Sequence, residues 1–214
     1  MNLLVLLSAV MSLTVTLYTP GSPPVVRQFP ICTDPGGQVE PAVSGNIVVW
    51  EHWRELPGKW NWDIDIYGYD LSQRRTFPIC TADADQRLPA ISGHIVVWQD
   101  RRNHPDESDG EDIYAYDLQT TREFPVCTAP RHQGWPAVSG DIIVWADARN
   151  YDRTGSDIYG YNLSTGREFA VCAAPGDQLR ASDLGQDRGL ARPPQRQVLR
   201  RRPVGSRHLR TRSV

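Results

Sequence analysis

The stretch from Pro89 to Trp98 reads Pro-Ala-Ile-Ser-Gly-His-Ile-Val-Val-Trp, and close copies of it stand at Pro41–Trp50 and Pro136–Trp145. A Ser-Gly pair followed by Asn, His or Asp is typical of a tight hairpin, and the apolar run after it is typical of a buried strand. Each copy is followed by an alternating segment such as Asp112–Leu118. Alternation with period two, rich in β-branched and aromatic residues, predicts a further strand.

A run of the type Phe-Pro-Ile-Cys ends each unit and supplies a fourth predicted strand. Its cysteines are Cys32, Cys80, Cys127 and Cys172, so the unit repeats every 45–48 residues. Self-similarity at such a period is typical of stacked units that cannot bury their apolar faces alone. Four short antiparallel strands in about 40–50 residues describe a β-propeller blade. The sequence therefore predicts an all-β fold, a β-propeller of four-stranded antiparallel blades.

The predicted propeller is incomplete. The chain enters it on an orphan fourth-strand run at Val26–Thr33, and about three blades follow. Closed propellers have about four to eight blades. Residues 25–178 are therefore expected to form a partial propeller, whose open blade faces and strand edges should make the chain poorly soluble or self-associating.

The repeat resembles the blade of TolB-like β-propellers over about Val25–Gln178, in its Pro-Ala-Val-Ser-Gly-x-Ile-Val-Val-Trp and Asp-Ile-Tyr-x-Tyr-Asp-Leu segments. Blades of that family usually carry Ser-Pro-Asp-Gly where this chain has Ser-Gly-Asn, Ser-Gly-His or Ser-Gly-Asp, so the hairpin here is shorter. The resemblance implies an exported or cell-surface protein that binds other proteins or ligands. Some similar propellers cap a peptidase domain.

Residues 179–214 differ in composition from the rest of the chain, with ten arginines, two aspartates and no lysine or glutamate. Read one nucleotide later, the codons allowed for residues 181–196 permit Pro-Ala-Ile-Ser-Gly-[Lys/Arg]-Ile-Val-Ala-Trp-x-Asp-x-Arg-Asn, which parallels Pro89–Asn103. We therefore predict a one-base slip near Gln178–Ala181 and a disordered tail read out of frame. The alternative is a basic arm for nucleic acid or anionic surfaces, but no aromatic residue is interleaved with its arginines. No nucleic-acid partner is predicted.

Residues 1–24 are predicted to be a signal peptide or membrane anchor with a Pro/Gly linker. Met1–Leu17 is almost wholly apolar, and turn-forming residues follow it up to Pro24. That length suits the hydrophobic region of a signal peptide better than a membrane span. No Lys or Arg precedes the apolar run, and no clear cleavage site follows it. Export to the cell envelope or the outside is favoured, with an uncleaved membrane anchor or a spurious upstream start as alternatives.

The cysteines are expected to be buried free thiols. They occupy equivalent positions of successive blades, packed sheets lie about 10 Å apart, and a disulfide needs Cα atoms about 4.4–6.8 Å apart. The absence of Cys-x-x-Cys argues against zinc. Acidic residues in the loops between second and third strands could ligate calcium, but their spacing matches no calcium loop. No cofactor is therefore predicted, with calcium as the alternative.

Two groups of loop residues are candidates for binding a protein or carbohydrate ligand. In the first blade, tryptophans surround Gly58–Lys59 and could form a contact surface, although blade packing explains them equally well. In the later blades the candidates are acidic. The predicted binding residues are Trp53, Trp60, Trp62, Asp106, Asp109 and Asp152.

No catalytic residue is predicted, because the chain has no Gly-x-Ser-x-Gly, His-Glu-x-x-His or phosphate-loop motif. The predicted function is a non-catalytic, exported binding scaffold. The alternative is the N-terminal gating propeller of a larger hydrolase or peptidase whose catalytic domain is missing from this chain. A third hypothesis is metal-assisted chemistry on the axial face. It would use the recurring aspartates, which better suit a structural hydrogen bond at a strand start: Asp63, Asp65, Asp112 and Asp157.

Overall fold

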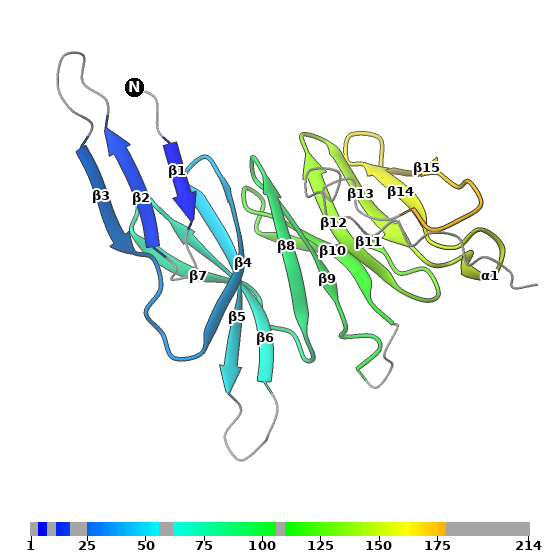
Figure 1. Cartoon of the computed structure of the whole chain (residues 1–214), viewed down its shortest axis with the longest axis horizontal. Coiled ribbons are helices and arrows are strands. Elements are labelled where there is room, and N and C mark those ends of the chain that lie inside the picture. Colours follow the sequence, from blue (N-terminus) through cyan, green and yellow to red (C-terminus); the bar gives the residue numbers. More distant parts are fainter. Residues whose placement is uncertain (1–3, 8–11, 18–24, 56–61, 106–109, 179–214) are drawn as a thin grey trace, which may run out of the picture. The chain divides into compact units, whose positions relative to one another are not determined.

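The structure is a computed structural model that describes residues 4–7, 12–17, 25–55, 62–105 and 110–178. These residues form four antiparallel sheets and one helical turn, α1 (Tyr151–Thr154) (Figure 1). The predicted out-of-frame tail, residues 179–214, lies outside the described residues. The prediction about that tail therefore stays a prediction.

Three of the sheets have four strands each and are the predicted blades, which we call blades 1, 2 and 3 (Figure 1). Blade 1 consists of β4 (Gly37–Ser44), β5 (Ile47–Glu55), β6 (Trp62–Asp70) and β7 (Arg75–Cys80). Blade 2 consists of β8 (Gln86–Ser92), β9 (Ile95–Asp100), β10 (Asp112–Asp117) and β11 (Arg122–Cys127). Blade 3 consists of β12 (Gln133–Ser139), β13 (Ile142–Asp147), β14 (Asp157–Asn162) and β15 (Arg167–Cys172). The predicted all-β class and the four-stranded antiparallel blades are confirmed.

A three-stranded antiparallel sheet precedes blade 1. It consists of β1 (Leu4–Leu7), β2 (Ser12–Leu17) and β3 (Val25–Pro30), with β2 in the middle. The strand on which the chain enters the propeller is therefore paired with β2 and is not an orphan, because two strands form within the segment predicted to be a signal peptide. In the described part of the chain, no helix is both long and apolar enough to cross a bilayer. The signal peptide itself stays a prediction.

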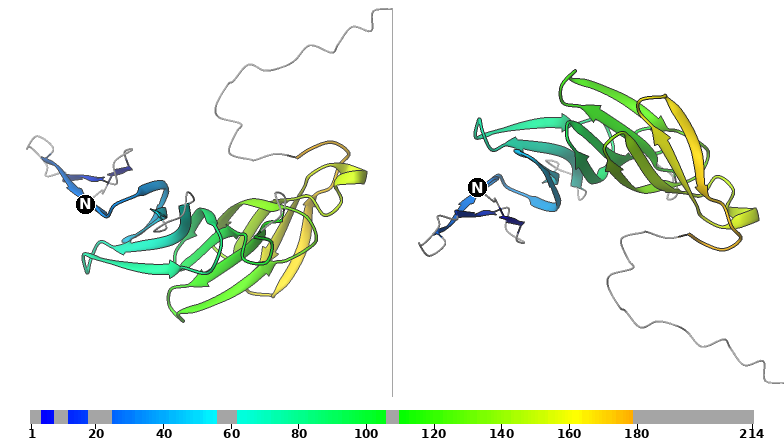
Figure 2. Two further views of the ribbon diagram at one scale, coloured as in Figure 1. Left: turned by 90° about the horizontal axis from the view of Figure 1, so that it is seen from below. Right: turned by 90° about the horizontal axis from the view of Figure 1, so that it is seen from above.

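The core lies between successive blades, as Figure 2 shows for the stacked sheets. Trp50, Trp98 and Trp145 are at most 1% exposed, which confirms that they pack in the core. Each tryptophan packs against the cysteine-bearing segment that precedes its blade. Burying such a large side chain against a neighbouring sheet contributes a few kcal/mol to stability. The contacts are Trp50 with Ile31 and Cys32, Trp98 with Ile79 and Cys80, and Trp145 with Val126 and Cys127.

A β-bulge interrupts the first strand of each blade just before its proline. The bulged residues Glu40, Leu88 and Trp135 have φ angles of 49, 53 and 51°, a left-handed conformation that is uncommon outside glycine. The bulge turns a backbone N–H toward the preceding blade. There the Leu88 N–H donates to Glu51 Oε1 at 2.7 Å and the Trp135 N–H donates to Gln99 Oε1 at 3.1 Å. The bulges therefore join the first strand of a blade to the second strand of the blade before it.

Candidate functional site

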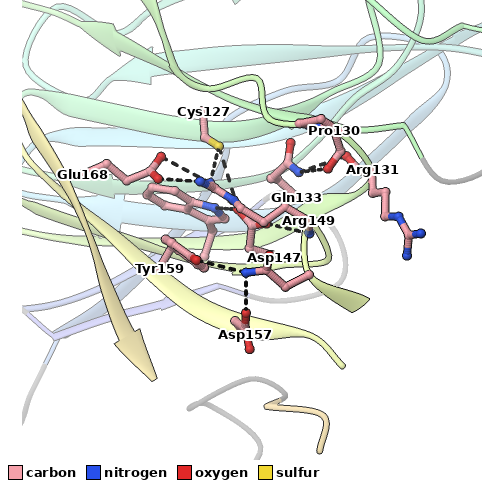
Figure 3. Close-up of polar contacts among 11 residues, drawn as sticks. Cys127, Pro130, Arg131, Gln133, Asp147, Arg149, Asp157, Tyr159 and Glu168 are labelled. Carbon is pink, nitrogen blue, oxygen red and sulfur yellow. Dashed lines mark hydrogen bonds and ion pairs between the residues drawn. The ribbon is translucent and has the colours of Figure 1, made fainter. Parts of the chain in front are cut away.

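A buried polar network recurs where each blade meets the one before it. In blade 3 the Arg149 guanidinium donates to both carboxylate oxygens of Asp147, at 2.9 Å from Nε and 2.6 Å from Nη2 (Figure 3). It also donates to Glu168 at 2.6 Å and to the Cys127 Sγ of blade 2 at 3.0 Å, and it lies 4.1 Å from the centroid of the Tyr159 ring. Each of the three guanidinium nitrogens thus donates to an acceptor inside the protein.

Blade 2 repeats this network residue for residue. Arg102 donates to Asp100, to Glu123 and to the Cys80 Sγ of blade 1, and Asp100 also accepts the indole N–H of Trp98 at 2.8 Å. Burial raises the pKa of the Cys80 and Cys127 thiols to about 12. A thiol with such a pKa is protonated at neutral pH and is a poor nucleophile. The network therefore acts as a structural joint between the blades, and its thiols are poor nucleophiles.

The aspartates at the starts of the third strands also serve the structure. Asn103 Nδ2 donates to Asp112 at 2.7 Å, and Asn150 Nδ2 donates to Asp157 at 3.1 Å (Figure 3). Both aspartates are fully buried. A strand-start hydrogen bond, expected from the sequence, is the observed role of these two carboxylates.

Blade 1 departs from the pattern because His52 stands where the later blades have an aspartate. The Trp50 indole N–H has no acceptor, and neither oxygen of the fully buried Asp65 has a hydrogen-bond donor, within the described residues. Arg54 forms an ion pair with Asp65 at 3.2 Å and a shorter one with Asp63 at 2.5 Å. Burial raises the pKa of Asp65 to about 6, although Arg54 opposes the shift. Within the described residues, the network of blade 1 thus contains buried polar atoms that have no hydrogen-bond partner.

The candidate ligand-facing site lies at the bulges, where second strands end and first strands begin. We call it the bulge surface and define it by Glu51, Trp53, Arg87, Gln99, Glu111, His132 and Trp135. Trp135 is 38% exposed although it is a large aromatic side chain. Its ring centroid lies 5.4 Å from that of His132, nearly at right angles. An exposed aromatic ring beside an imidazole can stack on a ligand and donate or accept a hydrogen bond.

The side chains of Glu111 and Gln99 contact the pair formed by His132 and Trp135. His132 Nδ1 lies 3.3 Å from Glu111 Oε2, and Gln99 Nε2 donates to the same carboxylate oxygen at 2.5 Å. Burial raises the pKa of Glu111, while the nearby His132 opposes the shift. Gln99 in turn accepts the backbone N–H of Trp135. The carboxylate, the amide and the imidazole therefore hold Trp135 in a fixed position.

The other half of the bulge surface lies between blades 1 and 2. The Trp53 indole N–H donates to Glu51 Oε2 at 2.9 Å, and the Arg87 guanidinium lies 5.7 Å from the Trp53 ring centroid. This is a cation–π arrangement at a partly exposed position. Trp53 is thus tied to the blade junction and is half-buried.

Among the sequence-predicted binding residues that the structure describes, Trp53 and Asp152 lie in different blades. Trp53 belongs to the bulge surface, whereas Asp152 lies in α1 with its side chain 78% exposed, 2.5 Å from Arg131. Trp62 lies in β6, opposite Glu55. The remaining predicted residues, Trp60, Asp106 and Asp109, lie outside the described residues. No group of three or more His, Cys, Asp or Glu side chains that could hold a metal occurs in the described ranges.

A concave pocket lies between the outer strands of blades 1 and 2. It has a volume of about 480 Å³ and is lined by Ile47, Asp70, Gln73, Arg75, Phe77, Pro78, Tyr116, Leu118 and Thr121. It lies at the ends of the blades where β6 turns into β7, and no residue of the bulge surface lines it. Its mixed lining offers less directed hydrogen bonding than the bulge surface.

Sequence reasoning missed His132, Glu111 and Trp135 as a group. Glu111 precedes a third strand, whereas His132 and Trp135 flank the start of the next first strand. Only the packing of blade 2 on blade 3 brings these positions together. One sequence signal was available: Trp135 precedes Pro136 at the position where the other blades have Glu40 and Leu88, so a large aromatic replaces a residue at the bulge.

Solved structures with this fold include TolB proteins and peptidase propellers. A putative TolB from Agrobacterium tumefaciens aligns with a TM-score of 0.51 and 12% identity, over 78% of this chain and 63% of that chain. The tricorn protease aligns with a TM-score of 0.53 and 12% identity, over 78% of this chain and 21% of that chain. No family model matches the sequence, and no curated protein matches it either. The fold is therefore an incomplete β-propeller that is similar to parts of these proteins, and the chain spans less than two thirds of either structure.

Proposed function

We propose that the protein is a non-catalytic binding scaffold that takes an extended peptide or a protein segment on its bulge surface. The carrying observation is Trp135, which is 38% exposed and held in a left-handed backbone conformation beside His132. A rigid exposed aromatic residue that is supported by hydrogen-bonded neighbours is typical of a binding hot spot. The TolB-like fold supports this proposal at the level of architecture alone.

Hydrogen-bonding capacity favours a peptide over a sugar at this surface. Glu111 and Gln99 are both engaged within the protein, and His132 has one ring nitrogen near Glu111. We propose that the other ring nitrogen of His132, Nε2, which lies beside Gly134, meets a ligand group. One aromatic face with one hydrogen-bonding group suits the side chain and backbone of an extended segment better than the many hydroxyls of a carbohydrate.

Replacing Trp135 with alanine is expected to weaken peptide binding by about thirtyfold or more, equivalent to about 2 kcal/mol. The measurement uses a displayed library of random peptides selected on the full chain, followed by determination of Kd for the selected peptides by titration. Tyr151→Ala is the matched control, because Tyr151 is also exposed and aromatic (50% exposed) but lies in α1. Selected peptides that bind both variants equally well would rule out the bulge surface.

The alternative proposal is a gating propeller of a larger hydrolase, for which the tricorn likeness is the relevant observation. At 12% identity that likeness supports the architecture and not the activity. Sequencing of the gene in both reading frames beyond codon 178 distinguishes the two proposals. A downstream Gly-x-Ser-x-Gly after a strand pattern would favour the hydrolase.

We also propose that the protein is exported to the cell envelope or secreted, on the strength of the apolar segment Met1–Leu17. Cleavage would remove β1 and β2 from the mature chain, because they lie within residues 1–24. N-terminal sequencing of the protein from fractionated cells tests this proposal. A mature terminus near residue 24 in an extracytoplasmic fraction is expected, and an intact Met1 in the cytoplasmic fraction would contradict export.

A further inference from the structure

One face of blade 3 is uncovered where the same face of the other blades is covered. Val171 and Phe169 are 54% and 40% exposed, whereas the residues equivalent to Val171, Ile79 and Val126, are 6% and 8% exposed. In blades 1 and 2 this face packs on the next blade. We call the uncovered surface the distal face of blade 3 and define it by Ser139, Phe169, Val171 and Cys172.

Two polar contacts recur at each of the two blade junctions. In the first, a serine hydroxyl accepts the backbone N–H of a hairpin glycine in the next blade: Gly93 to Ser44 at 2.9 Å and Gly140 to Ser92 at 3.0 Å. In the second, a cysteine Sγ accepts from an arginine of the next blade at 3.0 Å: Arg102 to Cys80 and Arg149 to Cys127. Ser139 and Cys172 are the equivalents on the distal face, and within the described residues neither has such a partner.

The chain after blade 3 is already shaped to begin another first strand. Gln178 Nε2 donates to the backbone carbonyls of Ala174 and Gly176, and its own backbone N–H donates to Ser156 at 2.8 Å. Gln133, the first residue of β12, makes the same kind of contacts with Pro130, Arg131 and Glu111. Gln86 likewise begins β8 and donates to Ala82 and Ala84. A first strand is therefore expected to start at Gln178.

Blade 1 of a second copy does not fit the distal face. Residues Ile31 and Cys32 already cover the face of blade 1 that would have to pack there. Blade 1 also has His52 in place of the aspartate that orients the arginine, and its Arg54 is turned toward Asp63. Residues 179–214 as written contain no tryptophan and so cannot supply the Trp-x-Asp-x-Arg motif.

We propose that the distal face of blade 3 docks one further blade of this repeat, carrying a Ser-Gly hairpin and Trp-x-Asp-x-Arg, which the shifted reading frame after Gln178 encodes. The codons allowed for residues 181–196 permit both elements in this frame, in the order and spacing of blade 2. Its hairpin glycine donates to Ser139, its arginine donates to Cys172, and its tryptophan covers Val171.

Alkylation of Cys172 by iodoacetamide, compared with Cys127 by mass spectrometry, tests this proposal. In the full chain as given, Cys172 should react at least about tenfold faster than Cys127, because Cys172 is only half-buried whereas burial raises the pKa of the Cys127 thiol to about 12 and shields it from the reagent. We call the full chain with its reading frame moved by one base after codon 178 the restored chain. In the restored chain, the alkylation rate of Cys172 should fall to that of Cys127. Unchanged reactivity of Cys172, or a restored chain less soluble than the given one, would overturn the proposal.

Val171→Asp provides a second test that does not depend on the thiol. In the chain as given the substitution should leave the melting temperature unchanged, because the Val171 side chain is largely in solvent. In the restored chain it should lower the melting temperature by several degrees, because it buries an unpaired carboxylate. Equal effects in both chains would contradict docking at this face. The bulge surface lies elsewhere, so failure here leaves the peptide-binding proposal unaffected.

Discussion

Replacing Asp100 with asparagine is expected to lower the free energy of unfolding by about 3–5 kcal/mol, the usual loss when one partner of a buried ion pair is removed. Asp100 is fully buried and accepts hydrogen bonds from the Trp98 indole, the Arg102 backbone and two nitrogens of the Arg102 guanidinium. An amide has one acceptor oxygen in place of two and no charge. The guanidinium would lose its fully buried counter-charge and would keep only the partly exposed Glu123.

Denaturant unfolding followed by tryptophan fluorescence measures this loss. Asp152→Asn is the matched control, since Asp152 also pairs with an arginine but is 78% exposed. An exposed pair contributes at most about 1 kcal/mol. A loss for Asp100→Asn no larger than that for Asp152→Asn would show that the network does not stabilise the blade junction.

Asp65→Asn is expected to stabilise the protein by up to about 3 kcal/mol at neutral pH. Burial raises the pKa of Asp65 to about 6 in the folded protein, above the ordinary value of 3.8. The folded state therefore holds this proton more tightly than the unfolded chain does. The contribution of Asp65 to the free energy of unfolding is highest below about pH 4, falls between about pH 4 and 6, and stays low above pH 6.

Unfolding curves of the wild type and the variant between pH 3.5 and about 7.5 test this expectation. The difference in free energy of unfolding should be near zero at the acid end and should grow through the pH window of the Asp65 titration. Asp63→Asn should not reproduce the gain, because Asp63 reaches solvent and accepts a hydrogen bond from Arg54 at 2.5 Å. A difference that does not vary with pH would show that Asp65 is ionised without cost.

The blades could be predicted from the sequence because each of their strands and hairpins leaves a pattern in neighbouring residues. Alternation in Asp112–Leu118, the apolar run before Trp98 and the Ser-Gly pair at Gly93 give strands and a hairpin without knowledge of their neighbours. The same holds for the buried tryptophans, because a large aromatic residue in a continuously apolar strand has few alternatives to the core.

Contacts between blades could not be predicted in the same way. Arg102 and Cys80 are 22 residues apart and meet only because one sheet packs on the next. The left-handed conformation of Leu88 and Trp135 has no composition signal of its own, since neither residue favours it. The arginine network is reflected in the sequence by the recurrence of Asp-x-Arg-Asn after Trp98 and Trp145.

The N-terminal strands were missed for a different reason. Leu13, Val15 and Leu17 alternate with threonines, which is a strand pattern. This pattern lies inside a segment whose total apolar content suits a signal peptide. We interpreted the segment from that content and therefore did not predict strands in it. Pairing of β2 with β3 is a non-local contact, for which the sequence of either strand alone gives no partner.

The backbone contacts between blades all run in one direction, and this gives the chain an order of assembly. The earlier blade supplies the side-chain acceptors, Ser44, Glu51, Ser92 and Gln99, and the later blade supplies only backbone N–H groups. During synthesis, domains and repeats fold from the N-terminus as they emerge. Each emerging blade therefore packs on a blade that has already folded. It forms these hydrogen bonds with backbone N–H groups and needs none of its own side chains for them. The growing protein exposes one unfinished face at a time, which limits misassembly on the ribosome.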